Sequence, residues 1–168
     1  MAKPGRPIHY DFDSCSRTFH VRQSPIFLIT RDDVMPHLVI LYTANLDREA
    51  DISGLCRSLC DTMLAQRDES GKQVFPTGGT RVLAYPAAHS AVADGKGDYG
   101  FLYMNLRMAK GRSPVVHQQM GEALKATVGS YLSDILADKP LGITVQIDEG
   151  HEVFDGKHST LHPLFNKA

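Results

Sequence analysis

Residues 35–64 have the sequence MPHLVILYTANLDREADISGLCRSLCDTML, and two patterns within this stretch decide the fold prediction. A short apolar run from His37 to Tyr42 is rich in residues that favour β structure and predicts a buried strand. After Asp51, apolar residues recur at spacings of three and four, as on one face of an amphipathic helix. The residues on this face are Ile52, Leu55, Cys56, Leu59, Cys60, Met63 and Leu64. A strand followed by a helix is therefore expected here.

The residues that follow complete a first structural unit. A polar stretch and the Pro/Gly-containing residues 75–79 precede Thr80 to Tyr85, which has the composition of a second strand. A strand, a helix and a strand connected in this way usually form a parallel pair. Residues 37–85 therefore predict one β-α-β unit.

The same order of elements recurs in the second half of the chain. A strand is predicted from Asp98 to Met108, and Ser113 and Pro114 suit the cap and the first position of a helix that Lys139-Pro140 ends. Residues 141–147 then alternate between apolar and polar side chains, as in a strand with one buried face.

Two β-α-β units in tandem predict an α/β fold of the α+β type. We expect a four-stranded mixed sheet with both helices on one face. Self-association is the economical way to cover the other face.

Composition limits the domain count and the partners. At 168 residues the chain has the length of one ordinary domain. We expect this domain at residues 36–168, after an irregular extension at residues 1–35. The net charge of −1 indicates neither a nucleic-acid partner nor a membrane partner. Three cysteines, an odd number, and the absence of an export signal favour the cytoplasm.

Several side chains could carry metal or redox chemistry. His158 and His162 lie four residues apart, but outside any predicted helix, so their spacing does not place them on one face. Cys56 and Cys60 share a helix face with apolar residues and are better explained as small buried side chains. No phosphate loop or dinucleotide-binding motif is present in the sequence. We therefore expect neither a metal nor a cofactor.

Two arginines are candidates for binding a substrate. Arg81 lies at the start of the second predicted strand, and Arg112 lies just before the second helix. An arginine presents a planar fork of donors that matches a carboxylate, and a nearby helix N-terminus adds favourable charge. The pair would suit a substrate with more than one carboxylate. The alternative is that both are solvated loop residues or pair with acidic neighbours.

Several short motifs resemble the 5-carboxymethyl-2-hydroxymuconate isomerase family. They are Met35-Pro36-His37-Leu38-Val39, Phe75-Pro76 with Gly79-Thr80-Arg81, Ala93-Asp94-Gly95 with Asp98-Tyr99, Gly111-Arg112-Ser113, and His162-Pro163-Leu164-Phe165. Each motif alone is weak, but together they occur in the family's order from Met35 almost to the C-terminus.

The resemblance implies a tautomerase-superfamily enzyme, commonly a homotrimer, that needs no cofactor. It implies isomerisation of 5-carboxymethyl-2-hydroxymuconate, a polycarboxylate enol acid, in homoprotocatechuate degradation. The catalytic group of this family is an amino-terminal proline, which corresponds to Pro36. Arg81 and Arg112 correspond to its substrate-binding arginines.

One feature departs from the family pattern, because 35 residues precede Pro36. A proline nitrogen inside a chain is an amide and cannot act as a base. Either translation starts at Met35, or the extension is genuine and is removed, or the protein is not this enzyme. Two other hypotheses therefore stay open: another tautomerase-superfamily activity, such as a 2-hydroxymuconate tautomerase, dehalogenase or hydratase, and a catalytically silent oligomeric binding protein.

Overall fold

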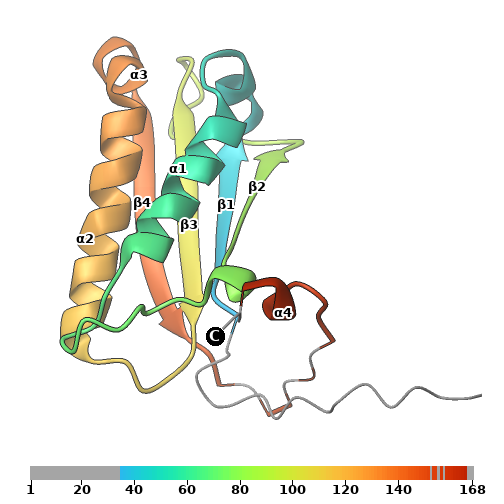
Figure 1. The fold of residues 1–168 in the computed structure, drawn as a ribbon. Coiled ribbons are helices and arrows are strands. Elements are labelled where there is room, and N and C mark those ends of the chain that lie inside the picture. Colours follow the sequence, from blue (N-terminus) through green and yellow to red (C-terminus); the bar gives the residue numbers. More distant parts are fainter. Residues whose placement is uncertain (1–34, 152, 155, 157, 166–168) are drawn as a thin grey trace, which may run out of the picture.

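A computed structural model describes residues 35–151, 153, 154, 156 and 158–165. The predictions for the N-terminal extension therefore lie outside the described residues, except at Met35. The fold places one layer of helices against one face of a single sheet (Figure 1).

The sheet has four strands in the order β2-β1-β3-β4. They span β1 (His37–Thr43), β2 (Arg81–Ala87), β3 (Gly100–Met108) and β4 (Leu141–Glu149). β1 pairs with β2 and β3 pairs with β4 in parallel, while β1 and β3 are antiparallel. The predicted mixed sheet of two β-α-β units is confirmed.

The two main helices begin where their capping residues predict. In α1 (Ile52–Ala65) the Asp51 side chain accepts a hydrogen bond from the Gly54 N–H. In α2 (Pro114–Tyr131) the Ser113 side chain accepts one from the Val116 N–H. Each cap satisfies a backbone donor that has no partner within the helix.

The second helix differs from the prediction, which continued it to Lys139. The structure ends α2 at Tyr131 and begins a separate short helix, α3 (Ser133–Asp138). Leu132 between them has φ −102° and ψ 19° and is only 2% exposed. The hydrogen bonds nevertheless continue across this position, since the Leu132 N–H donates to the Val128 carbonyl and the Leu136 N–H donates to the Leu132 carbonyl. The remaining short helices are η2 (Ala44–Arg48), η3 (Thr77–Gly79) and α4 (His162–Phe165).

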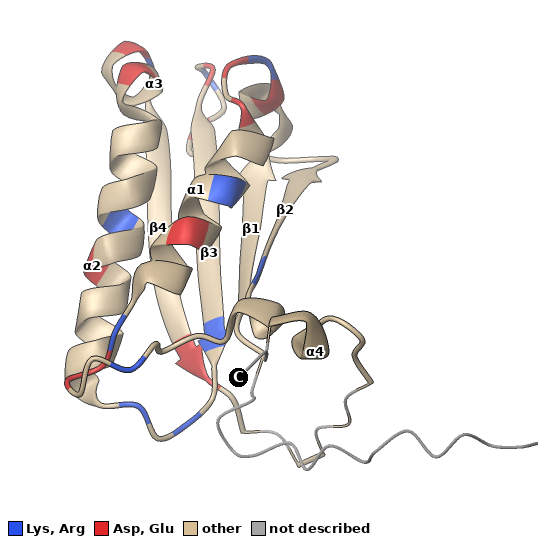
Figure 2. Cartoon of the chain, in the orientation of Figure 1, with Lys and Arg blue, Asp and Glu red and all other residues tan. Residues whose placement is uncertain are grey.

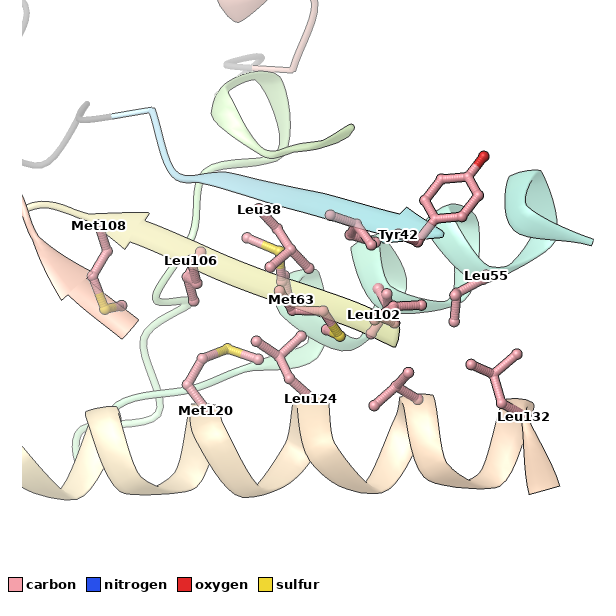
Figure 3. Close-up of a cluster of buried hydrophobic side chains, with 14 of the residues drawn as sticks. Leu38, Tyr42, Leu55, Met63, Leu102, Leu106, Met108, Met120, Leu124 and Leu132 are labelled. Carbon is pink, nitrogen blue, oxygen red and sulfur yellow. The ribbon is translucent and has the colours of Figure 1, made fainter. Parts of the chain in front are cut away.

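The core lies between the helices and the sheet (Figure 3). Alternate residues of β1 and β3 point into it, as the period of two of a strand requires. Its fully buried members include Leu38, Ile40, Leu55, Leu59, Met63, Leu102, Met104, Leu106, Met120 and Leu124. This packing fixes which face of every strand is turned away from the helices.

The opposite face of the sheet is apolar in the part away from the start of β1. Leu41, Leu83, Tyr85 and Phe101 are 49%, 42%, 50% and 39% exposed. The strand register places Leu41 directly opposite Tyr85. Exposed large side chains gathered in one patch are typical of a surface that another protein molecule covers.

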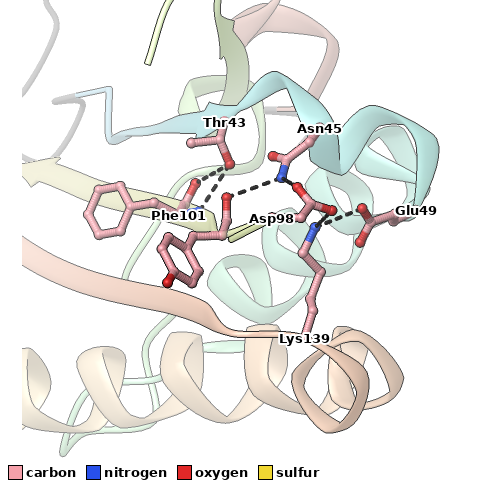
Figure 4. Close-up of polar contacts among 7 residues, drawn as sticks. Thr43, Asn45, Glu49, Asp98, Phe101 and Lys139 are labelled. Carbon is pink, nitrogen blue, oxygen red and sulfur yellow. Dashed lines mark hydrogen bonds and ion pairs between the residues drawn. The ribbon is translucent and has the colours of Figure 1, made fainter. Parts of the chain in front are cut away.

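Polar contacts fix the end of the sheet where β1 finishes (Figure 4). Lys139 Nζ lies 2.8 Å from Glu49 Oε1 and 2.9 Å from Asp98 Oδ2. Asn45 donates to Asp98 at 2.7 Å, and the Thr43 hydroxyl accepts the Phe101 N–H at 3.0 Å. These contacts connect the two β-α-β units at the end of the sheet opposite Pro36.

Candidate active site

Pro36 is buried immediately before β1. Its carbonyl oxygen accepts a hydrogen bond from the Arg81 N–H at 3.3 Å, so the starts of β1 and β2 are held side by side. The fixed φ of proline is compatible with the first position of a strand, and no donor is lost from the sheet there.

Arg81 is the first residue of β2 and lies opposite His37 in the parallel register. Its guanidinium donates from Nη1 to the Gly79 carbonyl at 2.7 Å. This bond turns the side chain back over the end of the η3 turn, close to the chain segment that enters β1. The backbone of Arg81 is therefore held beside Pro36.

Arg112 is held by the loop that follows β3. Nη1 donates to the Ala109 carbonyl at 3.0 Å, and Nη2 donates to the Val74 carbonyl at 3.2 Å. The guanidinium carbon also lies 5.7 Å from the centre of the Phe75 ring, a distance at which a cation is attracted to an aromatic face. The solvated-loop alternative is therefore wrong for Arg112, which is partly buried and well anchored.

The two arginines share one scaffold, the connection at residues 74–79. Arg112 bonds to its first carbonyl and Arg81 bonds to its last. Because β3 runs antiparallel to β1, the loop with Arg112 also leaves β3 at the end where β1 starts. Figure 2 shows Lys and Arg around this end of the sheet, in the loops and at the start of β2. Pro36, Arg81 and Arg112 therefore lie at the same end of the sheet, and the two arginines are cations of a kind suited to carboxylates.

The polar stretch before residue 74 also contributes to this end of the molecule. Glu69 accepts a hydrogen bond from the Ser113 hydroxyl, and this bond lowers the pKa of the Glu69 carboxyl. The contact ties the stretch to the start of α2, one residue after Arg112. Sequence alone gave no indication of this pair.

Arg107 is a further cation that motif-based reasoning missed. It lies opposite His37 in the antiparallel register of β1 and β3, on the sheet face away from the helices. The sequence could have placed Arg107 opposite His37 only if the register between β1 and β3 had been known.

The other candidate groups do not form a second site. Cys56 and Cys60 are partly buried on α1, and burial raises the pKa of the Cys56 thiol, which disfavours the reactive thiolate. In the part of the chain that the structure describes, no three His, Cys, Asp or Glu side chains are arranged to hold a metal ion. Within the same residues, no helix combines the length and the apolar character needed to cross a membrane.

Comparison with known proteins gives consistent matches. The sequence model of the family described as 5-carboxymethyl-2-hydroxymuconate isomerase matches residues 36–165. The 5-carboxymethyl-2-hydroxymuconate Delta-isomerase of Escherichia coli is 29% identical over 131 residues, which cover 78% of this chain and 99% of that protein.

Two solved structures are also similar. A 5-carboxymethyl-2-hydroxymuconate delta-isomerase has 52% identity and a TM-score of 0.78, over 81% of this chain and 96% of that chain. A 5-carboxymethyl-2-hydroxymuconate isomerase from Deinococcus radiodurans R1 has 31% identity and a TM-score of 0.72, over 80% and 97% of the two chains.

The similarity to these named isomerases over most of the chain shows an isomerase. The family match over residues 36–165 is more specific. The chain belongs to the 5-carboxymethyl-2-hydroxymuconate isomerase family.

Proposed function

We propose that the protein isomerises 5-carboxymethyl-2-hydroxymuconate and that the free amine of Pro36 moves the proton. The observation that carries this proposal is the position of Pro36 beside Arg81, within a loop system that also anchors Arg112. The names of the relatives point to the same substrate.

The chemistry needs one group that can accept and return a proton near neutral pH. A free α-amine has a pKa of about 8, and burial or neighbouring cations lower it, so that a neutral base is available. The amine takes the proton of the 2-hydroxyl group, the electron pair forms the 2-oxo group and the double bond shifts. The same proton then returns to carbon, and the atoms of substrate and product balance.

The arginines would bind the carboxylates and stabilise negative charge on the 2-oxo oxygen in the transition state. Arg112 is suited to this because its guanidinium is a planar fork of donors that matches a carboxylate, and its bonds to the Ala109 and Val74 carbonyls hold it in place.

This mechanism requires Pro36 to be the first residue of the active chain. In the full sequence Met35 precedes Pro36, so the nitrogen is an amide. The family match begins at residue 36, which supports residues 36–168 as the functional domain. Translation from Met35 with removal of methionine, or cleavage of a genuine extension, would each expose the amine.

We also propose that the protein is a cytoplasmic homotrimer acting in homoprotocatechuate degradation. The exposed apolar face formed by Leu41, Leu83, Tyr85 and Phe101 supports the oligomer, because contact with other subunits would remove this surface from water. Such an assembly would bring the site ends of neighbouring sheets close to one another.

The decisive experiment compares the chain beginning at Pro36 with the full-length chain in a spectrophotometric assay on 5-carboxymethyl-2-hydroxymuconate. We expect the full-length chain to be slower by at least the roughly 10²–10⁴-fold that a positioned general base contributes. Mass spectrometry of each protein must show that its N-terminus is intact. Equal activity in unprocessed full-length protein would exclude Pro36 as the base.

A second comparison tests the arginines. Arg112→Lys keeps the charge but loses the fork, and we expect kcat/KM to fall about tenfold or more. Arg57→Lys is the control, since Arg57 forms an exposed pair with Asp61 on α1 at 60% and 64% exposure. Unchanged kinetics for Arg112→Lys would remove Arg112 from the site.

Two other outcomes point to the alternatives. If the chain beginning at Pro36 turns over other enol or halogenated acids but not this substrate, another tautomerase-superfamily activity is correct. If the chain as made in cells keeps its extension and binds polycarboxylates without turnover, the silent binding protein is correct. The reason for considering this second alternative is that the nitrogen of Pro36 is an amide in the full chain.

A further inference from the structure

The C-terminal segment, residues 158–165, lies against the η3 turn (Figure 1). A Cβ built on Gly78 would lie 2.9 Å from His162 Cα and 3.3 Å from Phe165 Cδ2. The absence of a side chain at this buried glycine therefore allows the backbones of η3 and α4 to approach closely. Residues far apart in sequence thus meet at the end of the sheet where β1 begins.

His162 has an unsatisfied nitrogen in this contact. Its Nε2 is buried and makes no hydrogen bond within the described part of the chain. Buried polar atoms are nearly always hydrogen-bonded, and an exception at a functional end of a molecule indicates a missing partner.

The contact of the other ring nitrogen, Nδ1, bears on whether Nε2 carries a hydrogen. Nδ1 lies 3.1 Å from the Ser159 hydroxyl oxygen, and this oxygen accepts the Leu161 N–H at 3.2 Å. With its oxygen already accepting, the Ser159 hydroxyl can donate its hydrogen to Nδ1. In that arrangement the neutral ring bears its hydrogen on Nε2, which is then a donor and suits an anionic partner.

Nε2 and the Met35 side chain both lie near Gly79. The Cβ position of Gly79 lies 3.2 Å from His162 Nε2 and 3.6 Å from Met35 Cγ. The carbonyl of the same glycine accepts the hydrogen bond from the Arg81 guanidinium. His162, Met35 and Arg81 therefore surround one small residue, and Met35 is covalently joined to Pro36.

We propose that His162 is a substrate-binding residue whose Nε2–H donates to a carboxylate oxygen of the substrate. The inference rests on the proposed function, because in a chain that begins at Pro36 the Met35 side chain is absent. A substrate at the Pro36 amine would then border Gly79 and reach His162. Three side chains, Arg81, Arg112 and His162, would share the carboxylates of one substrate.

The test uses the chain beginning at Pro36 with His162→Asn and His162→Gln. The amide nitrogen of glutamine reaches about as far as Nε2, whereas that of asparagine reaches only the position of Nδ1. We expect His162→Asn to raise KM about tenfold to a hundredfold with kcat changed less than about threefold, as for loss of a charge-assisted hydrogen bond. His162→Gln should recover most of the affinity.

A matched control is His158→Asn, because His158 is an exposed residue of the same segment. Its KM should equal that of the parent chain. If both His162 variants have the same KM as the parent chain, the proposal is overturned. Equal loss in both variants, together with faster proteolysis of residues 158–165, would assign His162 a structural role only and would also overturn it.

Failure of the proposed function is distinguishable from failure of this inference. If the parent chain beginning at Pro36 has no isomerase activity, the same variants are titrated calorimetrically with tricarballylate, an unreactive tricarboxylate. If tricarballylate binds the parent chain and His162→Gln more tightly than His162→Asn, this would still support His162 as a residue that binds a carboxylate. Equal binding to all three would reject it.

Discussion

Gly78→Ala adds one methyl group at the contact between η3 and the C-terminal segment. The new Cβ would lie 2.9 Å from His162 Cα and 3.3 Å from the His162 nitrogen, both backbone atoms. Ordinary carbon–carbon contact begins near 3.5 Å, so the segment must move by about 0.5 Å or more. A rotamer change cannot relieve this contact, because the nearest atom belongs to the main chain.

The global stability should change little, while the local order of the segment should fall. Leu161, Leu164 and Phe165 are 49%, 61% and 54% exposed, so displacement of α4 returns only part of their surface to water. We expect a loss below about 2 kcal/mol in the free energy of unfolding. In the chain beginning at Pro36, KM should rise in parallel, because His162 moves with the segment.

Gly129→Ala is the matched control, the same one-methyl change where no atom lies within 4 Å of the new Cβ. Gly129 lies inside α2, so alanine should stabilise the helix by about 0.5–1 kcal/mol and raise Tm by about 2–4 °C. Hydrogen exchange and limited proteolysis of residues 158–165 compare the two variants. Unchanged protection of this segment in Gly78→Ala would refute the packing of α4 on η3, and with it the position of His162.

Three further predictions address the core, the open face and the polar end of the sheet. Leu124→Ala should cost about 2–5 kcal/mol in chemical denaturation, because Leu124 is fully buried, whereas Val115→Ala, at 49% exposure, should cost far less. Leu83→Asp should dissociate the oligomer in gel filtration with light scattering, and Val115→Asp should not. Hydrogen bonds from Lys139 and, to a smaller extent, Asn45 lower the pKa of Asp98 in the folded protein. These contacts therefore stabilise the fold fully above the unfolded pKa of about 4. The stabilisation is lost as the pH falls through the lower, folded pKa. Asp98→Asn should therefore flatten the decrease of Tm between about pH 5 and 3, and an unchanged pH profile would contradict this.

Much of the fold followed from local patterns. The apolar run of β1, the helical spacing in α1 and the cap at Ser113 were sufficient, because each pattern is decided by neighbours within about one or two turns. The parallel pairing followed from the order of elements alone. The break at Leu132 could not be predicted, because neither a proline nor a glycine stands at that position in the sequence.

The site was predictable only where motifs carried it. The role of Pro36 follows only from the resemblance, whereas Arg81 and Arg112 were already candidates from their positions, and the structure adds how they are held. His162 belongs to one of the same motifs, but only its contact with Gly79 gives it a neighbour in the site. A tail without periodicity gives no local rule for where it packs, so its partner on η3 could not be inferred from sequence.

The distribution of the family motifs gives an independent argument for the site. Four of them, around Pro36, residues 75–81, residues 111–113 and residues 162–165, meet at the end of the sheet where β1 begins. The fifth, which includes Asp98, lies at the opposite end, where Asp98 contacts Asn45 and Lys139. Some motif residues, such as Leu38 and Phe75, belong to the core, so packing alone explains part of this pattern. Packing does not require arginine side chains at the same end of the sheet, whereas a substrate with several carboxylates would, and this supports the proposal that Pro36 acts there as a free amine.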